Sequence, residues 1–153
     1  MLTDKIADSL RKTFDRILAD LLKATRASRT TLRLDDARYG FDVSDVAAEA
    51  LAPGQNSLRG QTSINQRAAA TARWVEENRR LLVQHDLSRG EPRAPEALIR
   101  LYGVKAQMLA PIERAGRLDG WISVHEAGAS RQWTAQDQAA VLEAAKRVLS
   151  ALA

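Results

Sequence analysis

Three residues on one face of a predicted strand have side chains that could contact a ligand: Trp121, Ser123 and His125. They alternate with Ile122 and Val124, so an extended chain would place the indole, the hydroxyl and the imidazole on the same side. A strand facing solvent more often carries Lys, Glu or Thr, so this mixture favours a face that borders a half-polar cavity. The imidazole of His125 could hydrogen-bond a ligand or ligate haem iron, or it could satisfy a backbone carbonyl within the fold.

Three further residues are candidates for lining the same cavity. His85 and Asp86 are adjacent at the end of a predicted strand, where neighbouring side chains point to opposite faces. Trp74 could stack on a ligand, although packing of a helix against the sheet explains it better. Two histidines without a third ligand make a poor metal site, so we predict no metal.

Arg67 is the last candidate, since Arg29, Arg33 and Arg67 could meet an anionic ligand, although an arginine is most often exposed. The net charge is +4, with 23 basic and 19 acidic residues interspersed along the chain. That pattern is typical of a solvated mixed-charge surface, so we predict no nucleic-acid partner.

A β-hairpin must position the three candidate side chains. From residue 104 to residue 112 the sequence alternates with period two, a polar turn follows at residues 114–117, and the return strand runs past residue 125. The apolar side of the hairpin consists of Val104, Ala106, Met108, Ala110, Ile112, Leu118, Ile122 and Val124. We expect this side to form a core under helices, which leaves the mixed face for a ligand.

Two amphipathic helices, at residues 3–24 and 134–152, are expected to cover that apolar face. Thr134 begins the second with a capping motif. The first is long enough to pair with a copy of itself, so we predict a homodimer through the terminal helices.

The middle of the chain alternates short elements. We expect strands at 28–35, 41–51 and 81–85, and a short helix that opens at Pro95. A longer helix over residues 64–77 would begin with a capping box of Ser63 and Gln66 and end at Asn78. The order predicts an α+β fold in one domain, 1–153, with segments 1–24, 28–127 and 134–152. A central antiparallel sheet of about five to six strands would have helices on both faces.

Several classes of function are excluded or disfavoured. The chain has no cysteine, which removes thiol catalysis and covalent attachment of a chromophore through a thioether. No apolar run is long enough for a membrane span, and the N-terminus lacks the features of a signal peptide, so we expect a cytoplasmic protein with no membrane partner. No nucleophile elbow, phosphate loop or dinucleotide fingerprint occurs, so we predict no catalytic residues.

The pattern resembles the GAF domain family over nearly the whole chain. The stretch VKAQMLAPIERAGRLDGWISVHE is similar to the family's penultimate hairpin, RQWTAQDQAAVLEAAKRVLSAL to its closing helix, and WVEENRRLLVQHDL to its middle helix and next strand. GWISVHEAGASRQW is similar to the corresponding part of phytochrome and cyanobacteriochrome GAF domains, which usually attach a bilin through cysteine.

The resemblance implies that the terminal helices cover one face of the sheet and that a ligand pocket, roofed by residues 52–103, lies on the other. It also implies a sensory domain that binds a small molecule reversibly, passes a signal to a partner protein and performs no catalysis. The cofactor stays unknown. Three alternatives stay open: a dimeric interaction module with a vestigial pocket, a non-covalent haem or bilin binder, and an unrecognised enzyme that acts on an aromatic or tetrapyrrole compound.

Overall fold

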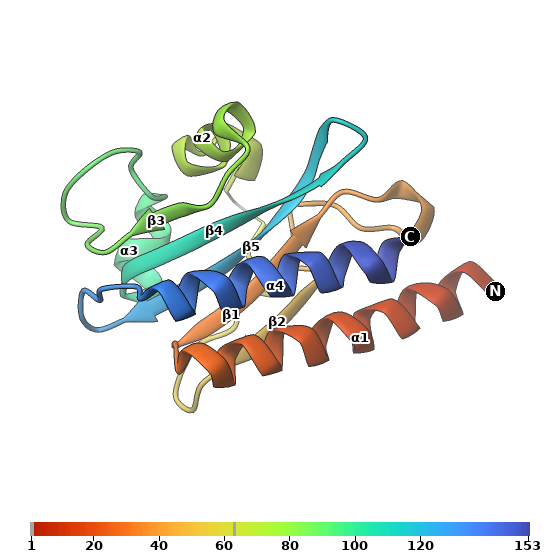
Figure 1. Ribbon diagram of the computed structural model, residues 1–153, viewed down its shortest axis with the longest axis horizontal. Coiled ribbons are helices and arrows are strands. Elements are labelled where there is room, and N and C mark those ends of the chain that lie inside the picture. The colour runs from red at the N-terminus through yellow and green to blue at the C-terminus, as the bar shows by residue number, and fades with distance from the viewer. Residues whose placement is uncertain (1, 63) are drawn as a thin grey trace.

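A five-stranded antiparallel sheet forms the centre of the computed structural model, which describes residues 2–62 and 64–153 (Figure 1). The strands are β1 (Arg29–Leu34), β2 (Ala48–Leu51), β3 (Leu82–Gln84), β4 (Val104–Arg114) and β5 (Arg117–Ala127). Their order across the sheet is β2-β1-β5-β4-β3. The predicted α+β class and the antiparallel sheet are confirmed, at the lower of the two expected strand numbers.

The predicted hairpin is the longest pairing in the sheet. Strands β4 and β5 are joined by Ala115 and Gly116, which both have positive φ, 51° and 78°. A two-residue turn of this kind matches the right-handed twist of the paired strands. The turn therefore fixes which side chains of β5 face each side of the sheet.

The terminal helices α1 (Leu2–Thr25) and α4 (Ala135–Leu152) cover one face of the sheet, where they lie side by side and antiparallel (Figure 1). Thr134 and Asp137 form the reciprocal capping box that begins α4. The sheet residues beneath them are apolar, as rows such as Leu32–Ile122–Ala110 across β1, β5 and β4 show. Six of the eight apolar residues predicted for this side of the hairpin thus belong to the helix-covered core: Ala106, Met108, Ala110, Ile112, Ile122 and Val124. The prediction is wrong for Val104 and Leu118, which pack with residues of the opposite face beyond shifts in the strand register.

Close approach of two strands explains Gly120 in this layer. A Cβ atom at this position would lie 2.0 Å from the carbonyl oxygen of Arg33 in β1, far inside van der Waals contact. Because that neighbour is backbone in a paired strand, it cannot move aside. Only glycine allows β1 and β5 to pair at this point.

The other face is covered by shorter elements: α2 (Ala70–Asn78), α3 (Glu96–Tyr102) and the loops between β2 and β4. α3 follows Pro95, as predicted, and ends at Gly103, whose φ is 64°. None of the helices in the described residues is long and apolar enough to cross a membrane.

The predicted strand over residues 41–51 is wrong in its first part, because β2 begins only at Ala48. Side-chain carboxylates bind the backbone amides that a strand would use: Asp35 Oδ1 accepts from Val43 N at 2.8 Å, and Asp42 Oδ1 accepts from Ser44 N at 2.8 Å. Such local bonds compete with a strand ladder. Residues 42–47 are therefore irregular.

The predicted start of the middle helix is also wrong. Residues Gln66–Ala68 form one 3₁₀ turn capped by Asn65, and α2 begins at Ala70. Ser63, the expected cap, lies outside the described residues. The helix ends one residue later than predicted, because Arg79 rather than Asn78 takes the left-handed conformation, with φ of 54°.

Candidate small-molecule site

The sheet face opposite the terminal helices carries polar side chains in rows that cross the strands. Across β1, β5, β4 and β3, the registered residues of the first two rows are Arg29–His125–Gln107–Gln84 and Thr31–Ser123–Leu109–Leu82. A third row places Arg33 beside Trp121. Because a strand alternates its side chains between faces, each polar row follows directly from the hairpin register.

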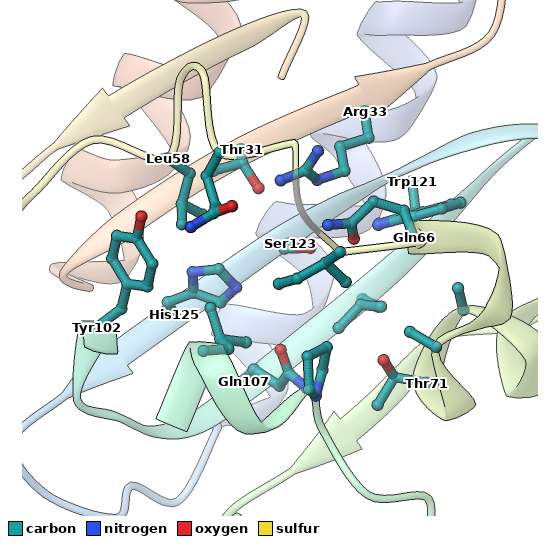
Figure 2. Close-up of a pocket in the computed structure, with 17 residues that line it drawn as sticks. Thr31, Arg33, Leu58, Gln66, Thr71, Tyr102, Gln107, Trp121, Ser123 and His125 are labelled. Atoms are coloured by element: carbon teal, nitrogen blue, oxygen red, sulfur yellow. The ribbon is translucent and has the colours of Figure 1, made fainter. Parts of the chain in front are cut away.

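A cavity lies between this face and the elements that cover it (Figure 2). Its floor carries most of the polar side chains, and its roof, from residues 58–62, 64–72 and 95–102, is lined by both apolar and polar residues. The hollow measures about 540 Å³ when the open space at its mouth is counted, and the space enclosed within it is much smaller. The lining consists of Thr31, Arg33, Leu58, Gln61, Ile64, Gln66, Ala69, Thr71, Ala72, Pro95, Leu98, Tyr102, Gln107, Leu109, Trp121, Ser123 and His125.

His125 is held as a neutral imidazole with a defined tautomer. Its Nδ1 lies 3.2 Å from Nη1 of Arg29, and since a guanidinium only donates, Nδ1 must accept. The remaining proton is therefore on Nε2. Burial, together with the charges of Arg29 and Arg33, lowers the pKa of His125 from 6.5 to about 3. An imidazole in this tautomer is a hydrogen-bond donor at Nε2 and has no lone pair there for iron.

Two arginines are buried beside the cavity. Arg29 is fully buried, donates from Nε and Nη2 to the carbonyl oxygen of Asn56 and stacks on the ring of Tyr102, 5.3 Å away. Arg33 is 5% exposed and donates from Nη1 to the carbonyl oxygen of Val43 at 2.9 Å. Among the described residues, neither guanidinium lies within ion-pair distance of a carboxylate. Burial lowers the pKa of both arginines, yet both stay charged at neutral pH.

Two glutamines link the cavity floor to its cover. Gln107 Nε2 donates to Gln84 Oε1 at 2.9 Å, and Gln84 Nε2 donates to the carbonyl oxygen of Pro92 at 2.6 Å. The backbone carbonyl of Gln84 also accepts from Nε1 of Trp133, at 3.1 Å, just before α4 begins. The chain of bonds therefore joins the cavity, a covering loop and the start of α4.

Of the predicted site residues, Trp121, Ser123 and His125 line this cavity together, and His85 and Asp86 do not. Nδ1 of His85 accepts from the backbone N–H of Trp133 at 3.1 Å, on the side of α4. Asp86 accepts from the amide and hydroxyl of Ser88 in the following turn, and these bonds lower the pKa of its carboxyl.

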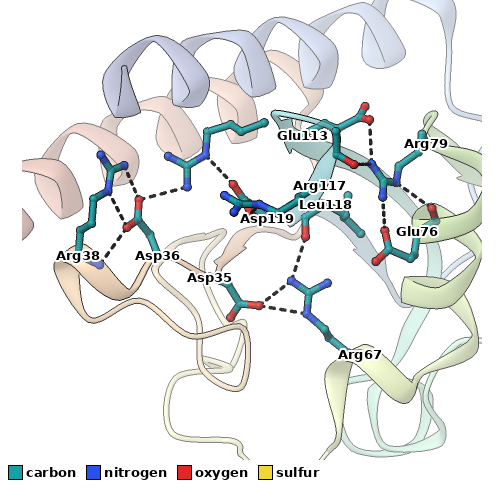
Figure 3. A network of polar contacts seen from close by, with 12 residues as sticks. Asp35, Asp36, Arg38, Arg67, Glu76, Arg79, Glu113, Arg117, Leu118 and Asp119 are labelled. Carbon is teal, nitrogen blue, oxygen red and sulfur yellow. Dashed lines mark hydrogen bonds and ion pairs between the residues drawn. The ribbon is translucent and has the colours of Figure 1, made fainter.

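Trp74 and Arg67 also lie outside the cavity lining. Trp74 is half-buried on α2, with the guanidinium of Arg80 5.3 Å from its ring. Arg67 forms an ion pair with Asp35 at 2.6 Å and donates to the carbonyl oxygen of Leu118, as Figure 3 shows. Its guanidinium also lies 6.0 Å from the ring of Trp121. Arg67 thus ties the helical cover to the sheet at the edge of the site.

The sequence prediction missed several floor residues, chiefly Thr31 and Gln107. It also missed that Arg33 is buried. The signal for them was the alternation of side chains along β1 and β4. Arg29, Thr31 and Arg33 alternate with the residues of β1 that face the terminal helices, and Gln107 alternates with the apolar residues of β4. Because both faces of the sheet are covered, the polar side chains on the second face are buried as well. The expectation of exposed arginines is wrong for Arg29 and Arg33.

Among the described residues, no three His, Cys, Asp or Glu side chains are grouped so that they could hold a metal ion. The model of one family, described as GAF domain, matches residues 9–152. The chain belongs to the GAF domain family. No curated protein matches its sequence.

Solved GAF structures have the same fold. The blue-light absorbing form of the PixJ GAF domain of Thermosynechococcus elongatus is 22% identical, with a TM-score of 0.76 over 95% of this chain and 86% of that one. The third GAF domain of Slr1393 of Synechocystis sp. is 16% identical, with a TM-score of 0.70 over 94% and 92%. The chromophore-binding domain of Stigmatella aurantiaca phytochrome P1 is 19% identical, with a TM-score of 0.69 over 91% and 52%.

A tetrapyrrole does not fit this GAF cavity as it stands. The space enclosed between the sheet and its cover is too small for four linked pyrrole rings. The chain has no cysteine for a thioether, and the tautomer of His125 offers no lone pair to haem iron. The residues present suit a smaller molecule that accepts hydrogen bonds.

Proposed function

We propose that this GAF domain is a non-catalytic sensor that binds a small organic molecule reversibly in the cavity between the sheet and its cover. The observation that carries the proposal is the set of hydrogen-bond donors on the cavity floor that no protein group accepts. Within the described residues, the hydroxyls of Thr31 and Ser123 have no hydrogen-bond partner, and both line the cavity although their residues are at least nine-tenths buried. No polar side-chain atom of the described residues is sealed in the core without a partner, so these two hydroxyls face the cavity, where a ligand or water can bind them.

The route from the site to the terminal helices supports a sensory role. A ligand that reorients Gln107 would act on Gln84, which bonds both the loop at Pro92 and, through its backbone, the indole of Trp133. Trp133 directly precedes the cap of α4. Ligand binding could then bias the position of α4 and pass a signal to a partner protein, provided that the ligand prefers one of the two positions.

Ligand screening by NMR tests the proposal. A library of small fragments should yield molecules that shift the backbone amide signals of Thr31, Ser123 and His125. The variant Ala72→Leu adds three carbon atoms to a buried cavity residue and should abolish these shifts. Ala70→Leu makes the same change at an exposed position of the same helix and should preserve them. The proposal fails if no fragment shifts these signals, or if Ala72→Leu leaves the shifts unchanged.

A second candidate function is a homodimeric interaction module whose pocket is vestigial. The small size of the cavity favours it, as do the exposed apolar side chains of Leu2 and Ile6 on α1 and Leu142 on α4, which are 74%, 40% and 43% exposed. Light scattering after size-exclusion chromatography should then report a dimer that Ile6→Glu dissociates. A wild-type monomer would remove the support for this candidate.

A non-covalent haem or bilin would require the cover to open widely, and a visible absorption spectrum of the purified protein tests for either pigment. We propose the cytoplasm as the compartment, which the absence of cysteine supports.

A further inference from the structure

We propose that the ligand of this cavity is a small monocarboxylate, held by its carboxylate group against Arg33, Ser123 and His125. The inference rests on the proposed function, because it specifies the chemical class of the molecule that this site binds. It is carried by the charge and hydrogen-bond donors of the cavity floor, which match one side of a carboxylate.

The first step is the charge of the site. Arg33 lines the cavity, and Arg29 lies directly behind His125. None of the described residues that line the cavity is acidic. A buried cation without an ion-pair partner is costly, and an anion in the cavity would relieve that cost. The floor is therefore electropositive and short of one negative charge.

The nearest carboxylates do not supply that charge inside the cavity. Asp45 and Glu49 act on Arg33 only at longer range. Their oxygens bind backbone amides of the covering loop: Glu49 Oε2 accepts from Leu58 N at 2.7 Å, and Asp45 Oδ1 accepts from Gly60 N at 3.0 Å. These two residues hold the cover in place and leave the cavity side of Arg33 free for a ligand.

The second step is the set of donors. One Nη1–H of Arg33 is bonded to Val43, and no protein partner is found among the described residues for its other guanidinium N–H groups. His125 presents its Nε2–H, as the tautomer requires, and the hydroxyls of Thr31 and Ser123 are adjacent across the β1–β5 pair. Figure 2 shows these four side chains converging on one space. A carboxylate accepts several such bonds at once, and bonds between charged partners are the strongest of the kind.

The third step is the size and polarity of the remaining space, which separate a carboxylate from other anions. The opposite side of the cavity offers an apolar patch with Ile64, Leu98 and Ala72 beside polar side chains such as Gln66, so the ligand should carry a short apolar tail. The small enclosed space suits a molecule about the size of propionate. A phosphate or sulfate would carry further charge into a site with one cavity-facing arginine. A monoanion with one polar end fits best.

Calorimetric titration with propionate and propionamide tests the inference. The two probes have nearly the same shape and differ in charge. With roughly five non-hydrogen atoms, propionate should bind with a dissociation constant of about 10 µM to 1 mM. Propionamide should bind at least about tenfold more weakly, because it lacks the charge that Arg33 requires.

Variants locate the effect. Arg33→Met should weaken propionate binding at least about tenfold. The matched control Arg73→Met removes an equal charge from an exposed position on α2 and should change binding less than about twofold. If Arg33→Met fails to fold, because it orphans the carbonyl of Val43, Ser123→Ala provides the test and should weaken propionate binding about three- to tenfold.

The outcomes separate this inference from the function on which it rests. Equal affinity for propionate and propionamide, or neutral fragments in the cavity without any carboxylate, would overturn the carboxylate class and leave a small-molecule sensor. Tighter binding of sulfate than of propionate would replace carboxylates with tetrahedral anions. If neither propionate nor any fragment binds at the cavity, both proposals fail together.

Discussion

Protonation of His125 should destabilise the folded protein on acidification. The pKa of His125 is about 3 in the folded protein and 6.5 in the unfolded chain. Between pH 6.5 and pH 3, the unfolded chain therefore binds a proton on this imidazole and the folded protein does not. Stability that is present above pH 6.5 is therefore lost as the pH falls towards 3. At about 1.4 kcal/mol for each pH unit between the two values, the upper limit is about 5 kcal/mol, of which about 2 kcal/mol is lost between pH 7 and pH 5.

Comparison with a variant isolates this contribution from the carboxyl groups, which titrate over part of the same range. His125→Gln removes the titrating group and keeps an acceptor for Arg29. Urea unfolding at pH 7, 6 and 5 should show the wild type losing about 2 kcal/mol more than the variant over this range. Parallel curves for wild type and His125→Gln would refute the assignment of a buried neutral imidazole.

Three further predictions concern the scaffold that positions the site. Gly120→Ala should destabilise the protein by at least about 3 kcal/mol in urea unfolding, because its Cβ would overlap the carbonyl of Arg33, and a loss below about 1 kcal/mol would contradict the strand spacing. Ala115→Gly should stabilise it by about 0.5–1 kcal/mol in the same assay by relieving positive φ at the hairpin turn, and destabilisation would contradict the turn geometry. Arg131→Met should cost about 2–3 kcal/mol, because it leaves Glu126 and Asp137 unpaired and frees the carbonyl of Thr25. The exposed Arg89→Met control should cost less than about 0.5 kcal/mol, and equal costs would refute this role of Arg131.

The parts of the fold that the sequence predicted are those with a long periodic signal. The hairpin and the two terminal helices each repeat one pattern over more than ten residues, and local chemistry marks their ends at Gly116 and Thr134. Residues 42–47 have no such pattern. There the carboxylate of Asp35 accepts a hydrogen bond from the backbone amide of Val43, which a strand would use for pairing. Asp35 belongs to another segment and comes close to Val43 only in the folded chain.

The sequence predicted the site residues that lie on a single strand. It missed those whose position depends on contacts between segments far apart in the sequence. Alternation alone placed Trp121, Ser123 and His125 on one face. At the β3 end, the same alternation turns Gln84 towards the cavity row and leaves His85 to bond Trp133 near α4, so proximity in sequence to a candidate site was misleading.

The buried arginines required knowledge that both faces of the sheet are covered. An arginine on a strand, such as Arg33, is usually exposed. Arg33 is buried without a carboxylate partner only because the loop of residues 57–60 covers this face of the sheet. No periodicity in the sequence reports that cover.

A crystal structure with the strongest-binding small molecule from the NMR screen tests the central claim most directly. The account predicts that the molecule lies between the sheet and its cover, in contact with Trp121, Ser123 and His125. A cavity closed by its own side chains, with the molecule bound elsewhere on the surface, would contradict it.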